Sequence, residues 1–278
     1  MTSRIVFLDI DGTIIDHSGE VPASAAQAIR TARRNGHRVM LASGRTPTEV
    51  DRRLVEIGFD GAILGAGAYA WVGELWTAGG WRIERLMAPA HVRRMVDGLR
   101  SVGADFVLQT RDEVRATRGG YARLEHQLAA SGRLTAATRE ALLSHIRVSD
   151  EPDLDQVAKA VFSSDDPGCF AAVTAELGDD FSVITGTMPG LGTAGGEISP
   201  AGVTKGSTLQ LLLDEVGVPV ADSIAIGDNN NDLEMLRLAG VGIAMGDGTP
   251  EALAAADETT TPVGEDGIWN AFARHGLV

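Results

Sequence analysis

Short apolar runs alternate with helical stripes along the first third of the chain. The run Ile5–Leu8 is apolar at every position, as expected for a strand buried on both faces. A helix follows it, and Gly36 stands where that helix should end. The predicted strands are 5–8, 39–42 and 62–64, and the helices between them carry apolar stripes at Ala25, Ile29 and Ala32, then at Val50, Leu54 and Ile57. This order predicts a parallel sheet covered by helices on both faces.

The same alternation returns near the carboxyl end, but the middle of the chain reads differently. There, strand-like runs at 106–108 and 181–184 are mixed with longer amphipathic helices, which is typical of an α+β insert. Glycine-rich segments at 79–80 and 188–196 bracket this stretch and are predicted to be linkers. We therefore predict an α/β fold, a Rossmann-like parallel sheet built from residues 1–81 and 194–278, with an inserted α+β domain at 82–193.

Composition narrows the choice of partners. Hydrophobic residues make up 44% of the 278 residues and charged residues 22%, as in ordinary globular proteins. Acidic residues outnumber basic ones, 38 to 24, for a formal charge of −14. This balance argues against nucleic acid and anionic membranes as partners. An anionic substrate would need a metal ion or a well-placed lysine to reverse the local field.

Other features are unremarkable chemically. Cys169 is the only cysteine, and its apolar neighbours indicate a small buried side chain rather than a catalytic thiol. The six histidines lack metal-ligand spacing. The amino-terminal residues do not resemble a signal peptide, and no apolar run is long enough to span a bilayer, so a cytoplasmic location is expected.

Candidate chemistry lies where the first predicted strand ends. Asp9 and Asp11 follow it directly, and because side chains alternate along an extended chain, both carboxylates should project to one side. Such a pair can divide labour between an ionised nucleophile or metal ligand and a group that exchanges protons. Gly12 lets the backbone turn away sharply. Alone, this motif is equally consistent with a polar strand cap.

Three further motifs stand at strand ends or helix starts. Ser43 and the amide of Gly44 could hold a phosphoryl oxygen, although a turn serine is the simpler reading of that position alone. Lys205 begins a helix, where its charge opposes the helix dipole unless an anion lies nearby. Asp228 and Asp232 follow the strand at 224–226, and Mg²⁺ prefers such hard oxygen ligands.

Together the motifs DIDGT, SGR, TKG and GDNNND resemble, in this order, the four motifs of the haloacid dehalogenase superfamily. The three-residue spacing between Asp228 and Asp232 and the long insert are similar to the Cof-type sugar phosphatases, whose caps are of class IIB. Two segments depart from the family pattern. Ala66 stands where asparagine is common, and Asp247-Gly248 replaces the usual Asn-Ala. Neither position belongs to the four motifs, so the departures concern substrate recognition and loop geometry rather than the reaction.

The resemblance implies a role for each matched residue. Asp9 would be the nucleophile and Asp11 the general acid and base, with Mg²⁺ held by Asp9, Asp228 and the backbone carbonyl of Asp11. The phosphoryl group would be bound by Ser43, Gly44, Lys205 and Asn231. Gly12, Thr13, Arg45 and Asp232 would support the site, and the insert would be a mobile cap. The implied activity is Mg²⁺-dependent hydrolysis of small phosphorylated metabolites through an aspartyl phosphate.

Two alternatives remain open from the sequence. A phosphomutase would share the nucleophile and the metal, and a non-catalytic sensor of phosphorylated metabolites would share the pocket. A third reading, a dinucleotide fingerprint at Gly190, Gly192 and Gly195, is rejected because the following Glu197-Ile198-Ser199-Pro200 segment does not open a helix. The sequence names neither the substrate nor the oligomeric state.

Overall fold

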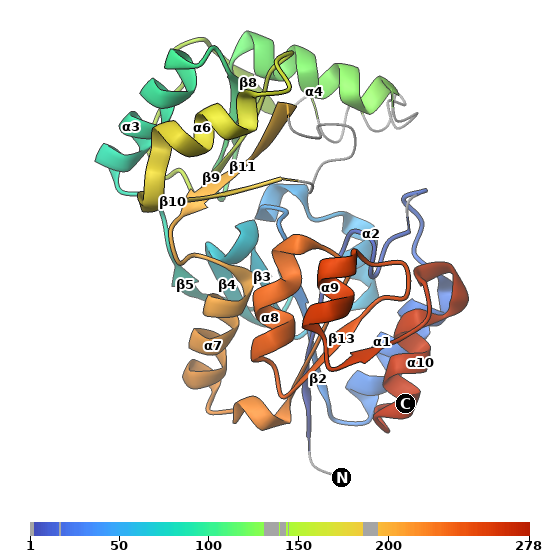
Figure 1. The fold of residues 1–278 in the computed structure, drawn as a ribbon. Coiled ribbons are helices and arrows are strands. Elements are labelled where there is room, and N and C mark those ends of the chain that lie inside the picture. The colour runs from blue at the N-terminus through green and yellow to red at the C-terminus, as the bar shows by residue number, and fades with distance from the viewer. Residues whose placement is uncertain (1–2, 17, 131–138, 140–142, 144, 186–193) are drawn as a thin grey trace. The chain divides into compact units, whose positions relative to one another are not determined.

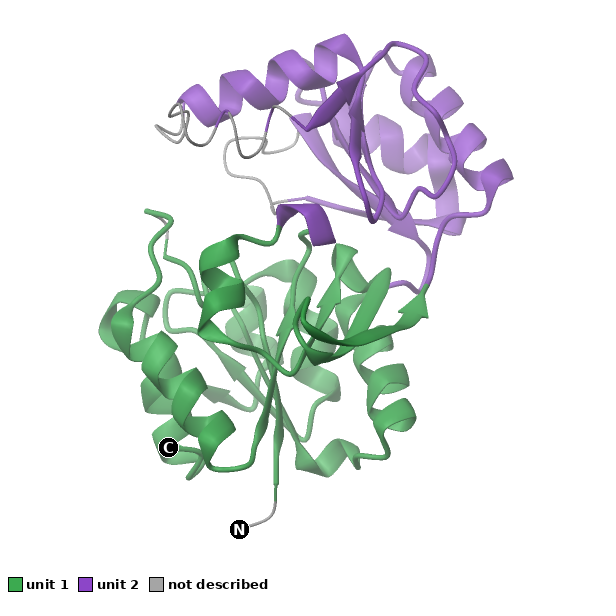
Figure 2. Ribbon diagram, turned by 180° about the vertical axis from the view of Figure 1, so that it is seen from behind, with its two compact units in different colours: residues 1–45, 50–84, 204–278 green, residues 46–49, 85–203 purple. Residues whose placement is uncertain are grey.

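A computed structural model describes residues 3–16, 18–130, 139, 143, 145–185 and 194–278 of the chain. The chain forms two compact units, shown in different colours in Figure 2. The first comprises residues 1–45, 50–84 and 204–278, and the second comprises 46–49 and 85–203. In the described part of the chain, no helix is both long enough and apolar enough to cross a membrane.

The first unit is built on an eight-stranded sheet (Figure 1). Its strands, in spatial order, are β14 (Glu258–Thr259), β13 (Val241–Ala244), β12 (Ser223–Gly227), β1 (Ile5–Leu8), β2 (Arg38–Ala42), β3 (Gly61–Leu64), β4 (Tyr69–Glu74) and β5 (Ala78–Glu84). The strands from β14 to β3 run parallel, and β4 and β5 add an antiparallel hairpin at one edge. This confirms the predicted parallel α/β core.

Helices cover both faces of this sheet, as the uniformly apolar strands require. Ile5 and Phe7 pack in one core with apolar residues of three helices, and Val6 and Leu8 alternate to the other face, where α1 and α10 lie (Figure 1). The helices of the first unit are α1 (Ala23–Arg34), α2 (Arg52–Ile57), α7 (Lys205–Val216), α8 (Leu233–Leu238), α9 (Pro250–Ala255) and α10 (Gly267–Arg274). The predicted stripe of α1 is confirmed, since Ala25, Ile29 and Ala32 are all buried.

The second unit has its own sheet and core. Its strands, in spatial order, are β10 (Phe181–Ile184), β11 (Gly195–Pro200), β9 (Lys159–Ser163), β6 (Asp105–Gln109), β7 (Val114–Ala116) and β8 (Ile146–Val148). Its described helices include α3 (Pro89–Ser101), α4 (Arg118–Ala130) and α6 (Cys169–Leu177). Phe106 and Phe162 of the sheet pack with Val92 of α3 and Val173 of α6, so this is an α+β unit with a separate apolar core.

Three sequence predictions need correction. Gly79 and Gly80 are not a linker, because they lie inside β5, where Gly79 crosses closely over the carbonyl oxygen of Val72. Of the second bracket, Gly195 and Gly196 belong to β11, while 188–193 lie outside the described residues. Val50 is not part of a helix, since α2 begins at Arg52 after the N-cap Asp51. Strand glycines misled the prediction because glycine more often marks turns.

Strands β5 and β11 explain where the sequence divides between the two compact units. Apart from residues 46–49, the second unit runs from Arg85 to Val203, whereas the sequence predicts an insert at 82–193. The difference arises because β5 continues through Glu84 and because β11 pairs with β9 and β10.

Candidate active site

Neighbouring parallel strands bring three predicted site residues to one edge of the first sheet. Asp9, Ser43 and Asp228 each follow directly on the last residue of β1, β2 and β12. Because β1 lies between β12 and β2 and Leu8 pairs with Ile226 and Leu41, Asp9 lies within one residue of the level of Ser43 and Asp228 at the carboxyl ends of the strands. Asp9 is 4% exposed and Ser43 1%, so both point into the protein rather than toward solvent.

The loop after β1 shapes the site through backbone geometry. Gly12 has a φ of 89°, and a Cβ atom built there would lie 2.3 Å from Oδ2 of Asp228. Glycine is therefore required both for the left-handed turn and for the close approach. Next to it, the Thr13 hydroxyl donates to Oδ1 of Asp228 at 3.1 Å. The expected supporting roles of these two residues thus take a definite form, because both fix the Asp228 carboxylate.

Lys205 enters the site from the first turn of α7. Thr204 and Ser207 form a reciprocal capping box that fixes where this helix begins. The Lys205 side chain is fully buried, and its ammonium donates to Oδ1 of Asp9 at 2.5 Å and to Oδ1 of Asp232 at 2.6 Å. Burial alone would lower the pKa of Lys205, but the two carboxylates together raise it above its ordinary value. The lysine is therefore a permanent cation at the nucleophile.

The turn after β3 supports the same lysine. A Cβ atom on Gly67 would lie 2.2 Å from the carbonyl oxygen of Thr204, and the Thr208 hydroxyl donates to the carbonyl oxygen of Gly67 at 2.6 Å. Neither Gly67 nor Thr208 is among the site residues that the sequence predicts. Their role depends on contact between segments far apart in the chain, and the only sequence signal was the glycine-rich stretch itself.

Within this turn, Ala66 adopts a φ of 56° and a ψ of 26°, a left-handed conformation that costs an alanine about 1–2 kcal/mol. We expect Ala66→Gly to stabilise the protein by about 0.5–1 kcal/mol, because glycine relieves the strain but loses more entropy on folding. Ala68→Gly is the matched control, since Ala68 is buried and right-handed and its change should destabilise. Urea unfolding measures both, and equal destabilisation by the two changes would contradict the prediction.

Asp232 contacts both the loop after β12 and the Lys205 side chain. Its Oδ2 accepts from the backbone amides of Asp228 and Asn229, both at 3.1 Å, while its Oδ1 accepts from Lys205. A Cβ atom on Gly227 would lie 2.5 Å from the Asp232 carboxyl carbon, so glycine is needed there too. Because three residues separate Asp228 from Asp232, the Asp232 side chain can reach back to the start of the loop and hold it in place.

Three carboxylates come together in this arrangement. Oxygen atoms of Asp9, Asp228 and Asp232 lie within 4.8 Å of one another. Burial is the main cause that raises the pKa of Asp228 to about 7, and the charge of Asp232 adds to it. Burial also raises the pKa of Asp9, against the opposing effect of Lys205 and with further increases from Asp232 and Asp228. One ammonium thus leaves the cluster undercompensated, a condition that a divalent cation with oxygen ligands would relieve.

Asp11 occupies a different environment from Asp9. Its carboxylate is 50% exposed and is gripped by Arg45, whose Nη2 donates to Oδ1 at 2.7 Å and whose Nε donates to Oδ2 at 2.9 Å. The charge of Asp11 still contributes to the raised pKa of Asp9, so the two groups are electrostatic neighbours. The sequence placed Arg45 near the pocket, and the structure assigns it to Asp11.

Of the remaining predicted residues, Ser43 accepts at its hydroxyl oxygen from the Arg45 amide at 3.2 Å, with Gly44 between them. Asn231 is half-buried, and its Oδ1 meets no hydrogen-bond partner among the described residues. The structure therefore brings Asp9, Lys205, Asp228 and Asp232 into one cluster. Ser43, Gly44 and Asn231 follow β2 and β12 at the same edge of the sheet, and their role in binding a phosphoryl group stays a prediction.

A buried aspartate nucleophile candidate, an adjacent lysine and a carboxylate cluster at this edge of a parallel sheet define a phosphoryl-transfer type of α/β site. Comparison with known proteins agrees: residues 6–272 match the haloacid dehalogenase-like hydrolase family, and the chain belongs to that family. It is therefore a haloacid dehalogenase-like hydrolase, and several of its relatives are named phosphatases.

Several individual proteins are similar to this chain over most of their length. YkrA of Bacillus subtilis is 28% identical over the full length of both chains. The HMP-PP phosphatase of Cronobacter sakazakii is also 28% identical, over 91% of this chain and 87% of its own length. The fold matches that of a solved HAD subclass IIB sugar phosphatase, BT4131, with a TM-score of 0.76 and 19% identity over 99% of this chain and all of that one.

Proposed function

We propose that this protein is a Mg²⁺-dependent phosphohydrolase that cleaves small phosphomonoesters through a phosphoryl group carried on Asp9. The observation that supports this most directly is the Lys205 ammonium held 2.5 Å from a buried Asp9 carboxylate. Two unit charges at close range repel by about 4 kcal/mol at an intermediate dielectric, so an anionic nucleophile needs cations to approach a phosphate. Lys205 provides one, and the carboxylate cluster would hold the other.

The residues present fit Mg²⁺, which prefers carboxylate oxygens as ligands. The pKa values of Asp9 and Asp228 are raised, as expected for crowded carboxylates that a bound cation would stabilise in their charged form. Asp9, Asp228 and the backbone carbonyl of Asp11 would bind the ion, which would neutralise charge on the transferring phosphoryl group. Asp232 has both oxygens engaged by Lys205 and by loop amides, so we assign it to positioning rather than to coordination.

In the proposed reaction an oxygen of Asp9 forms a bond to phosphorus as the ester oxygen leaves, and Asp11 gives that oxygen a proton. A water then attacks the same phosphorus, Asp11 takes up the water's proton, and the Asp9 carboxylate is released with inorganic phosphate. Lys205 and the hydroxyl of Ser43 would hold phosphoryl oxygens, helped by the Gly44 amide and Asn231. Arg45 would hold Asp11 in place between turnovers.

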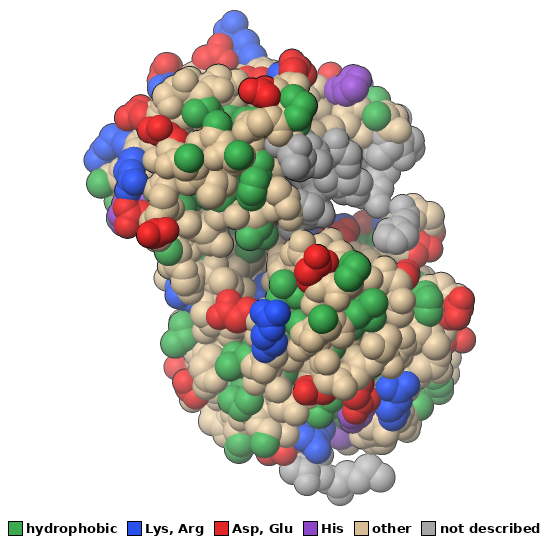
Figure 3. Space-filling model, viewed as in Figure 1, with side chains coloured by type: hydrophobic (Ala, Val, Ile, Leu, Met, Phe, Trp, Pro, Cys, Tyr) green, Lys and Arg blue, Asp and Glu red, His purple; other side chains and the backbone are tan. Residues whose placement is uncertain are grey.

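The substrate would be a small phosphorylated metabolite, and the second unit would act as the cap that selects it. Relatives carry names that include phosphoglycolate phosphatase and 5-amino-6-(5-phospho-D-ribitylamino)uracil phosphatase, which supports this size class. Acidic and basic side chains are interspersed among the described residues on the face shown in Figure 3, which gives nucleic acid no continuous basic track. We also propose a cytoplasmic location, following from the sequence.

Mg²⁺ dependence is the first test. With an aryl phosphate as substrate, Mg²⁺ should support release of inorganic phosphate, and excess chelator should abolish it. Saturating Mg²⁺ should also raise the melting temperature by about 5 °C or more, because it binds only the folded cluster. In Asp228→Asn this shift should shrink sharply. Full activity in chelator would refute the metal requirement, and phosphoryl transfer without release of inorganic phosphate would favour a mutase.

A further inference from the structure

The sheet of the second unit has two chemically different faces. Phe106 and Phe162 point into the apolar core shared with α3 and α6. Because side chains alternate along a strand, Val107, Gln109 and Val161 point away from that core. These outward positions carry both apolar and polar side chains, and they line a cavity within this unit rather than an ordinary solvated surface.

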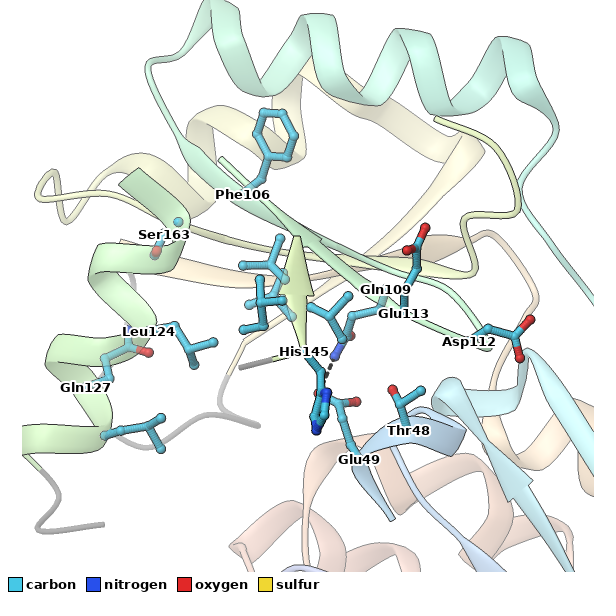
Figure 4. A pocket seen from close by; sticks show the side chains of 16 residues that line it. Thr48, Glu49, Phe106, Gln109, Asp112, Glu113, Leu124, Gln127, His145 and Ser163 are labelled. Carbon is cyan, nitrogen blue, oxygen red and sulfur yellow. Dashed lines mark hydrogen bonds between the residues drawn. The ribbon is translucent and has the colours of Figure 1, made fainter. Parts of the chain in front are cut away.

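The cavity has a volume of about 580 Å³, within the range of small-molecule sites (Figure 4). One wall is the sheet, with Val107 and Val161 among its lining residues, and Leu124 and Leu128 of α4 line it as well. Both leucines are only partly buried, so the helix does not fill the space beside the sheet. The first turn of α4 approaches most tightly, since a Cβ atom on Gly120 would lie 2.4 Å from the carbonyl oxygen of Phe106.

Gln109 provides a directed polar group in this apolar setting. It is 6% exposed, and its Nε2 donates to Oε1 of Glu49 at 2.7 Å (Figure 4). Glu49 is itself fixed, because its other oxygen accepts from the amide and the hydroxyl of Thr46, each at 2.7 Å. A carboxylate must face the amide NH₂ rather than its oxygen, so the orientation of Gln109 is determined. Its buried Oε1 then meets no donor among the described residues.

A buried acceptor without a donor costs about 1–3 kcal/mol, and a ligand that supplies an N–H or O–H would recover it. The nearest lysine in the sheet, Lys159, pairs in register with Gln109 but is ion-paired with Glu197. Glu113 at the cavity is likewise paired with Arg115. The lining also includes Glu49, which accepts from Gln109 and Thr46, Asp112, which is paired with Arg111, and the imidazole of His145. Its carboxylates are therefore already engaged, and the cavity offers a ligand hydrogen bonding and apolar contact.

We propose that this cavity binds a planar heteroaromatic group of the substrate, with a ring donor bonded to Oε1 of Gln109. Apolar side chains on the sheet and on α4 suit a flat ring, whereas a polyol would leave hydroxyl groups unpaired against valine and leucine. The inference deepens the proposed function and rests on it in one respect only, that the second unit selects the substrate.

Binding without chemistry gives the first test. Titrating the full-length protein with pyridoxine and, separately, with sorbitol in a calorimeter should show a Kd below about 1 mM for the aromatic alcohol and no measurable binding of the polyol. Val161→Phe, which fills the cavity, should abolish pyridoxine binding, and Gln109→Met should weaken it by about tenfold. Val148→Phe is the matched control on an exposed strand position outside the lining, and it should bind as the wild type does.

Hydrolysis gives the second test. Rates on pyridoxal 5′-phosphate and on glucose 6-phosphate are each divided by the same variant's rate on acetyl phosphate, which carries no ring or polyol. Val161→Phe should lower the first ratio at least tenfold and leave the second within twofold. The inference would be overturned if pyridoxine and sorbitol bound equally well, or if both ratios were unchanged in Val161→Phe. As long as acetyl phosphate is still hydrolysed, either result leaves the proposed function intact. Absence of Mg²⁺-dependent phosphate release from all of these substrates and from the aryl phosphate would overturn the proposed function, while the titration would still decide the cavity's preference.

Discussion

Asp9→Asn should abolish turnover while leaving the protein folded, because the amide keeps the shape of the side chain and removes the anionic nucleophile. Asp9 is buried beside Lys205, and the other carboxylate at that lysine, Asp232, is held by two loop amides, so it should not replace Asp9 as the nucleophile. Release of inorganic phosphate should fall to the background rate. Rapid quench followed by intact mass measurement should find no phosphoryl group on this variant.

Asp11→Asn should behave differently, because its side chain is half exposed and paired with Arg45 rather than with Lys205. Loss of the proton relay should slow turnover by about 10² to 10⁴. With an aryl phosphate, whose leaving group needs little protonation, Asp9 should still be phosphorylated but then hydrolysed slowly. The phosphoenzyme should accumulate in this variant alone. A label mapped to Asp11 or to a serine, or one that persists in Asp9→Asn, would show that the roles are assigned wrongly.

The different surroundings of these two aspartates show what the sequence could and could not predict. Their position after the first strand was evident from an apolar run followed by acidic residues, and the parallel sheet followed from the alternation of strands and helices. That Asp9 is buried and Asp11 exposed was not evident, because alternation placed both on one side. The difference lies in contacts between segments distant in the chain, since Asp9 is buried beside Lys205 whereas the half-exposed Asp11 carboxylate is paired with Arg45.

Lys205 illustrates the opposite case. Its unfavourable place at a helix start already pointed to an anion, and the structure supplies two, Asp9 and Asp232. What the sequence could not show is the support behind it, since Gly67 and Thr208 meet across 141 residues of chain. Strand glycines such as Gly79 were misread for a related reason: local propensity favours a turn, and only pairing with β4 makes the segment a strand.

Lys205→Met should be the most damaging single change for stability. It removes the ammonium but leaves two buried carboxylates, and breaking a buried ion pair in this way costs about 3–5 kcal/mol. The cost depends on pH. Burial already holds the pKa of Asp9 above its ordinary value, and Lys205 opposes that rise, so the folded-state pKa of Asp9 should rise further without the lysine. The added destabilisation is present above this folded-state pKa and shrinks as pH falls through it. Urea unfolding at pH 7 and pH 5 should show a clearly smaller loss at pH 5.

The double variant Lys205→Met, Asp232→Asn separates the missing cation from the unpaired anion. Neutralising Asp232 removes one of the two stranded charges, so the double variant should unfold at higher urea concentration than Lys205→Met alone, a positive coupling in a double-mutant cycle. Lys159→Met is the matched control, because Lys159 is also buried and ion-paired, with Glu197, in the other unit. Lys159→Met should destabilise the protein by the same amount whether or not Asp232→Asn is also present. If Lys205→Met lost as much stability at pH 5 as at pH 7, or if the second change destabilised it further, the cost would come from lost packing around the lysine and not from uncompensated charge.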